Sequence, residues 1–353
     1  FIAGVNAGNS ITSGGNYNVV VGDEAGTAIT TGDYNTAVGM NALIATTTAA
    51  SNTALGFKAL YANITGASNT AVGTNSLDAN TTGASNVAVG QSALGGNTTA
   101  SYNTAVGAVA LGANTTGTSN TAVGYNAVAA NTTGIQNTSI GGFSLASNTT
   151  AAGNTAIGFG TLYTNTTGAS NTAVGLNALN LSTTASNNTA VGSSALIANT
   201  TGASNTAVGF NALTANTTAA NNTAMGQSAL AANTTGTANV AVGLNGLDAN
   251  TTGNYNTSVG TSALGGNTTA HSNGAFGFKA LLANTTGTNN NAFGDSALRA
   301  NTTGNENTAF GNNAGTAITT GVGHVVVGKD ALKVCTTGTY NTAIGRQALF
   351  GDT

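Results

Sequence analysis

The side chains with the greatest chemical capacity are few and lie far apart along the chain. The histidines are His271 and His324, the single cysteine is Cys335, and one adjacent acidic pair is Asp23-Glu24. Catalysis or metal binding requires several such groups to converge, and no recurring partner accompanies these. We therefore predict surface positions for both histidines, an inert thiol and a solvated acidic turn. The sequence predicts no catalytic residue, no cofactor-binding residue and no metal ligand, so the chain is expected not to be an enzyme.

Composition excludes further classes of protein. Charged residues make up 4% of the chain and the net charge is −3, so clustered Lys and Arg for nucleic-acid binding are absent. No apolar run approaches the ~20 residues of a membrane span, which predicts no membrane insertion by this segment. The many Asn-Thr-Thr triplets match glycosylation acceptors. Their fixed register favours stacked ladders of Asn and Thr, with side-chain amides bonding along the stack.

The whole chain is one repeat. The motif Asn-Thr-Ala-Val-Gly recurs in 19 steps of 17 residues from Gly22 to Gly345, and one earlier coil around Gly4 is a residue longer. The consensus is N-T-A-V-G-x-N-A-L-x-A-N-T-T-G-A-S, which residues 103–119 represent; its positions are numbered 1 to 17. A constant length over many copies predicts that each unit closes one turn of a solenoid. The short unit and its Gly, Asn and Thr content oppose a helical repeat.

The predicted fold is all-β, a parallel β-solenoid or β-roll of about 20 coils with 17 residues per coil. Two short strands, N-T-A-V-G and N-A-L-x-A-N, are expected in each coil, joined by turns rich in Gly, Asn and Ser. At ~4.8 Å per coil, the array would form a straight rod of roughly 95–100 Å. We interpret 1–353 as a single repeat array and as a fragment of a longer chain.

Variation within the repeat indicates which side chains face inward. Position 4 is always apolar, as at Val38 and Phe276, and position 3 is Ala or Ser in nearly every coil. Alternation places these positions on opposite faces of a strand. We predict Val inside the roll beside Leu43, and Ala at a contact between chains. Position 10, which accepts Ile44 and Arg299 among others, is expected to face solvent.

Three coils exchange apolar volume between two positions. Gly replaces the usual Leu of position 9, and Ile replaces the Asn of position 12 three residues later. We expect both positions to reach one interior space that must stay filled. The pairs are Gly8 with Ile11, Gly26 with Ile29 and Gly315 with Ile318.

The core of one chain is predicted to be thin, with mainly one Val, one Leu and a few Ala per coil. Association of several chains would bury a second stripe, and three chains suit a fibre with a threefold axis. We therefore expect a parallel homotrimer, although ladder stacking alone would permit a monomer.

The N-T-A-V-G-x-N-A-L repeat resembles the left-handed β-roll repeat in heads of trimeric autotransporter adhesins, whose motif reads roughly S-V-A-I-G-x-x-A. It is more similar still to NTAVG-type repeats of phage tail fibres and related bacterial trimeric fibre proteins. The resemblance covers essentially the whole chain and implies a homotrimer outside the cell, on the cell surface or on a virion. No stalk or membrane anchor of an adhesin is visible, so the choice between adhesin and phage fibre stays open.

The expected function is that of a structural fibre shaft that spaces and displays a receptor-binding region. Any host-cell surface receptor would then be bound through regions outside this segment. Two alternatives remain. An ice-binding β-solenoid would use the Thr of position 2, although its exchange with Val19 and Val325 and the interruptions at Gly274 and Asn291 oppose this. A self-assembling extracellular filament subunit is the other.

Overall fold

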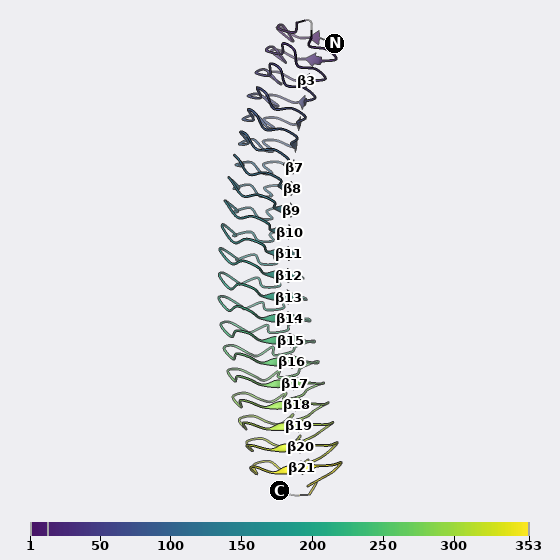
Figure 1. Cartoon of the computed structure of the whole chain (residues 1–353), viewed down its shortest axis with the longest axis vertical. Coiled ribbons are helices and arrows are strands. Elements are labelled where there is room, and N and C mark those ends of the chain that lie inside the picture. Colours follow the sequence, from purple (N-terminus) through teal and green to yellow (C-terminus); the bar gives the residue numbers. More distant parts are fainter. Residues whose placement is uncertain (1, 13, 352–353) are drawn as a thin grey trace. The chain divides into compact units, whose positions relative to one another are not determined.

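A computed structural model describes residues 2–12 and 14–351. The chain is an all-β parallel β-solenoid of about 19 turns with about 17 residues per turn, which confirms the predicted fold class and repeat length. The coils divide into two compact units, Phe1–Ala173 and Val174–Thr353, each of which is described by itself. Figure 1 shows that in each unit every coil contributes one short strand.

The strands recur once per coil. They are β1 (Ile2–Ala3), β2 (Val19–Val21), β3 (Thr36–Val38), β4 (Thr53–Leu55), β5 (Thr70–Val72), β6 (Val87–Val89), β7 (Thr104–Val106), β8 (Thr121–Val123), β9 (Thr138–Ile140), β10 (Thr155–Ile157), β11 (Thr172–Val174), β12 (Thr189–Val191), β13 (Thr206–Val208), β14 (Thr223–Met225), β15 (Val240–Val242), β16 (Thr257–Val259), β17 (Gly274–Phe276), β18 (Asn291–Phe293), β19 (Thr308–Phe310), β20 (Val325–Val327) and β21 (Thr342–Ile344).

Within each unit, consecutive strands pair in parallel and in the same register. Thr104 lies opposite Thr121 and Val106 opposite Val123, and the same 17-residue offset holds along the second unit, for example from β12 to β13. Equivalent side chains therefore stack in rows along the sheet. Each consensus position therefore has nearly the same surroundings in nearly every coil.

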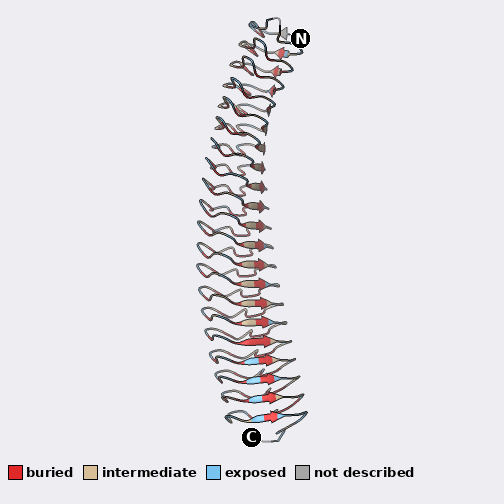
Figure 2. Cartoon of the chain, viewed as in Figure 1, coloured by how far each residue is buried: buried red, intermediate tan, exposed pale blue. Residues whose placement is uncertain are grey.

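The interior of each coil is formed by Ala and Leu. In the coil that contains β7, Ala105, Ala110 and Leu111 are fully buried, whereas Val106 is 36% exposed. The prediction that Val faces inward and Ala forms a contact between chains was therefore wrong. Position 3 faces the interior of its own coil, where Ala fills it in most coils and Val20 and Val326 are fully buried in two others. Figure 2 shows the resulting alternation of buried and more exposed positions along the strands.

The second predicted strand, N-A-L-x-A-N, is absent from the coils that the structure describes. Positions 6 to 11 form successive turns in which positions 7 and 9 adopt left-handed backbone angles, with φ of 59° at Val109 and 51° at Leu111. These angles turn the neighbouring side chains of Ala110 and Leu111 to the same side, which a strand cannot do. The amide N–H of Leu111 donates to the carbonyl of Ala127 in the next coil at 3.0 Å, so this wall is also bonded along the stack.

The exchange between Leu and Ile is confirmed. Ile29 and Ile318 are fully buried. A Cβ atom on Gly26 would lie 2.9 Å from Cδ1 of Ile29, and one on Gly315 would lie 2.8 Å from Cδ1 of Ile318. The Ile side chain therefore occupies the space that Leu fills in other coils. Ile11, in the first coil, is only half-buried.

Position 10 faces outward, as expected. Ile44 is half-buried, Arg299 is exposed and Tyr61 is 40% exposed.

Candidate functional site

The structure keeps the two histidines apart but places His324 and Cys335 in one coil, where a Cβ atom on Gly338 would lie 2.8 Å from Sγ of Cys335 and 3.9 Å from Cε1 of His324. His271 lies in an exposed turn at position 16, whereas His324 begins a coil three repeats later in the sequence. Among the residues that the structure describes, no group of three or more His, Cys, Asp or Glu side chains is placed to hold a metal ion. The described coils therefore contain no cluster of the size that a metal site requires.

His324 is fully buried, so its predicted surface position was wrong. It stands at position 1, where Asn is the rule, and reproduces the bonds of that Asn. Its Nε2 lies 2.6 Å from the carbonyl oxygen of Gly338, and its Nδ1 accepts the backbone N–H of Asn341 at 3.2 Å. These partners require a neutral ring with the proton on Nε2. Burial lowers the pKa of His324 below its usual value, against the effect of both hydrogen bonds.

Acid is expected to destabilise the coils around His324. A folded-state pKa below the ordinary ~6.5 means that the unfolded chain binds more protons between these two values. The contribution of the neutral ring to stability is therefore fully present above pH ~6.5 and is lost as pH falls through the folded pKa. Thermal unfolding of the chain, compared at pH 7 and pH 5, should show a lower midpoint at pH 5.

His324→Asn restores the consensus residue and should flatten this pH dependence. His271→Asn is the matched control, because it removes an exposed histidine and retains His324; its pH dependence should follow that of the parent. An unchanged pH dependence in His324→Asn would contradict the assigned role.

The other candidate groups are structural or solvated. Cys335 is 2% exposed at position 12, with Sγ 3.8 Å from Nδ2 of Asn341, so the thiol is held inside the coil. Asp23 is exposed and Glu24 bonds to Asn6 at 2.8 Å, in agreement with a surface turn. Burial raises the pKa of Asp78, against nearby backbone N–H groups that lower it.

The Asn ladders are confirmed. At position 1, the Nδ2 group of Asn86 donates to the carbonyl of Ala100 in its own coil at 2.9 Å, and its Oδ1 accepts the backbone N–H of Asn103 in the next coil at 3.0 Å. At position 12, Asn97 donates to the same carbonyl of Ala100 at 3.0 Å and to Oδ1 of Asn80 at 2.8 Å. Because these Asn side chains are fully buried, the folded coil does not offer them for glycosylation.

The largest regular surface is the outer face of the sheet, which we define as the side chains of positions 2 and 4. From β2 to β21, position 4 holds only Val, Leu, Ile, Met or Phe. These residues remain substantially exposed: Leu55 is 47% exposed, Met225 45% and Phe310 59%. No charged residue stands at position 2 or 4 in these strands. An apolar row this regular and this exposed is unusual for a protein surface that contacts only water.

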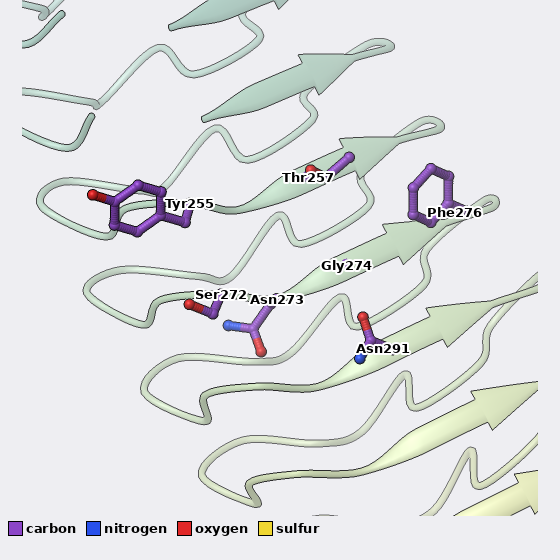
Figure 3. Close-up of a pocket in the computed structure, with 7 residues that line it drawn as sticks. All are labelled: Tyr255, Thr257, Ser272, Asn273, Gly274, Phe276 and Asn291. Carbon is purple, nitrogen blue, oxygen red and sulfur yellow. The ribbon is translucent and has the colours of Figure 1, made fainter. Parts of the chain in front are cut away.

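One hollow interrupts this face in the second unit. It has a volume of about 280 Å³ and is open to solvent; its lining residues are Tyr255, Thr257, Ser272, Asn273, Gly274, Phe276 and Asn291. Figure 3 shows Thr257, Asn291 and Phe276 around Gly274, which occupies position 2 in place of Thr. The hollow exists because one side chain of the Thr row is missing. Sequence reasoning noted Gly274 as an interruption but not as a hollow.

Comparison with known proteins adds no family: no protein-family model matches the chain, and no curated protein sequence matches it. The class of protein is defined by the structure alone, a repeat protein with a parallel β-solenoid fold. Within the described part of the chain, no helical segment has the length and hydropathy to traverse a lipid bilayer.

Proposed function

We propose that this chain is the structural shaft of an extracellular or virion-borne fibre, a spacer that displays a receptor-binding region carried elsewhere on the fibre. The observation that supports the proposal most is the constancy of the coil: each repeat adds one strand, and most repeats add one rung to each Asn ladder. Such an array grows in length by a fixed step while its cross-section stays nearly constant. Binding sites normally rest on a few convergent groups, and in the described coils no three His, Cys, Asp or Glu side chains converge to hold a metal ion.

Self-association along the outer face of the sheet is the second part of the proposal. With Ala inside each coil, the exposed rows of Thr and Val are the surface left for a contact between chains. Parallel chains in register would cover an uncharged, apolar row, which suits the core of a protein interface. A parallel homotrimer, closed around a threefold axis, satisfies all copies equally and agrees with the resemblance to trimeric fibre proteins.

Deletion of whole coils tests the spacer role. Removing residues 103–136 takes out two coils of the first unit and rejoins the chain at equivalent positions. The variant should fold, and the array should shorten by about two strand spacings, ~10 Å, as measured by electron microscopy against the parent. The intact fibre that carries the shortened array should still attach to its target surface.

Deletion of residues 103–110 is the control, because it removes part of a coil and shifts every row out of register. This variant should lose stability where the 34-residue deletion does not. Loss of attachment by a fibre that lacks 103–136 but still folds and reaches its surface would show that the array itself is the recognition element.

Ice binding is the second candidate, and one observation favours it: the Thr row of position 2 lies on the outer face and is partly exposed in most strands. Its Val replacements are exposed too, at 39% for Val19 and 41% for Val325, which removes the objection that this row is buried. The two functions need the same face. A chain that stays monomeric and depresses the freezing point of water below the melting point would favour ice binding over the fibre.

A further inference from the structure

When two copies of a uniform array associate, the repeat alone does not fix which coil of one copy faces which coil of the other. Neighbouring coils present nearly the same Thr and Val pair, at a spacing of ~4.8 Å. A second copy displaced by one coil therefore meets nearly the same surface. Registers are weakly specified wherever successive positions are alike. Parallel chains need a singular feature on the outer face to align their ends.

Such a feature lies at β17, β18 and β19. Phe276, Phe293 and Phe310 occupy position 4 in three consecutive strands, and no other strand from β2 to β21 has an aromatic residue there. The rings of Phe276 and Phe293 stack with centroids 4.6 Å apart and planes 3° apart, and those of Phe293 and Phe310 are 5.6 Å apart. They form a raised aromatic row, 59% exposed at Phe310, in a face that is otherwise aliphatic.

The hollow at Gly274 lies directly beside this row. The backbone of Gly274 is paired in register with Thr257 and Asn291, and its φ lies outside the left-handed region, so the strand does not require glycine there. What glycine provides is space: a Cβ atom would lie 2.9 Å from Oδ1 of Asn291 and 3.6 Å from Cε2 of Phe276. The outer face thus carries a projection and a depression within one strand.

We propose that the row Phe276–Phe293–Phe310 and the hollow at Gly274 set the register in which this chain associates with a second copy of itself. The inference rests on the self-association proposed above. In register, three rings face three rings, and the hollow receives the edge of a ring from the neighbouring copy. A slip of one coil removes one of the three aromatic pairs and sets the outermost rings against Val259 and Val327.

The spacing suits another copy as the partner. A partner whose rows do not recur at the strand spacing would drift out of step within a few coils, whereas a second copy keeps pace along the whole contact. The chain exposes 12712 Å², about 600 Å² per 17-residue coil. If the outer face contributes a quarter of this, about six coils reach the ~800 Å² per partner of a standard interface.

The test measures register and mass on the same samples. Cys335→Asn removes the native thiol and restores the consensus residue, and Gln227→Cys places one spin label at an exposed position 6. In this parent, pulsed electron paramagnetic resonance should give one narrow distance between labels of associated chains. The triple variant Phe276→Val, Phe293→Val, Phe310→Val should keep its oligomeric mass in light scattering and show a broader distribution that reaches longer distances, because the labels are then displaced along the stack by multiples of one coil. Gly274→Thr, which restores the consensus and fills the hollow, should broaden the distribution without removing any ring.

Phe57→Val, Phe159→Val and Phe210→Val together are the matched control. These three exposed rings occupy position 6, beyond the strands, and their loss should leave the distance narrow. The register site is contradicted if the distance distribution stays narrow in both the Phe triple variant and Gly274→Thr, or if it is broad in the parent. In either case an unchanged oligomeric mass would still support self-association. A monomeric parent instead overturns self-association itself, and the register site with it.

Discussion

Gly107→Ala should disrupt the stack around its coil and lower the free energy of unfolding by about 3–5 kcal/mol, the sum of backbone strain and overpacking. Gly107 stands at position 5 with φ of 133°, a region that side chains other than glycine rarely adopt. A Cβ atom there would lie 2.5 Å from the carbonyl oxygen of Gly124 in the next coil. Neither the backbone nor that carbonyl can move without breaking the pairing of β7 with β8.

Chemical denaturation of the two variants side by side provides the measurement. Gly95→Ala is the control: it adds the same methyl group at position 10 of the preceding coil, where other coils carry Ala, and the nearest atoms to its Cβ lie 3.3 Å away. Its midpoint should stay close to that of the parent. Equal midpoints for Gly107→Ala and Gly95→Ala would mean that the close approach of successive glycines carries no structural constraint.

The repeat length, the parallel stacking and the inward Leu could be predicted because each depends on a pattern that recurs in every coil. The orientation of the strand could not. Three residues, Thr, Ala and Val, define two faces by alternation, but both faces contain apolar side chains, and size alone does not say which one is inside. In the structure, the adjacent residues Ala110 and Leu111 are both buried. Two consecutive inward side chains are incompatible with a strand, so the recurring Ala-Leu pair in the sequence indicates a tight turn at positions 8 and 9.

His324 shows the same limit at the level of a single residue. A histidine in a repeat of polar composition suggests a surface position. Position 1, however, is Asn in all the remaining coils from Asn18 to Asn341. A residue that replaces a ladder Asn must supply both a donor and an acceptor, and a neutral imidazole does so. Had the role of position 1 been known, the buried site of His324 would have followed from its register.

The second large effect is expected in the Asn ladder, where Asn120→Leu should lower the free energy of unfolding by about 2–4 kcal/mol. Oδ1 of Asn120 accepts the backbone N–H of Asn137 at 3.0 Å, and its Nδ2 donates to the carbonyl of Gly134 at 2.9 Å. After substitution the Gly134 carbonyl keeps its bond from Asn131 at 3.0 Å, but the buried N–H of Asn137 has lost its acceptor. Leaving one such group unsatisfied costs about 1–3 kcal/mol, and the other lost bonds, which include those to Asn103 and from Nδ2 of Asn137, add to it.

Asn126→Leu is the matched control, since it makes the same change in the same coil at position 7, where other coils carry Val109 and Phe143. Because Asn126 has a left-handed φ of 53°, where Leu is less favourable than Asn, this change should cost about 1 kcal/mol, less than Asn120→Leu. Asn120→His should recover most of the stability at pH 7, because the ring can donate from Nε2 to Gly134 and accept from Asn137 at Nδ1, as His324 does with Gly338 and Asn341. The recovery should disappear as pH falls to 5, when protonation of Nδ1 sets two donors against each other. If Asn120→His were no more stable than Asn120→Leu at pH 7, the ladder would depend on the size of the amide and not on its pairing of donor with acceptor.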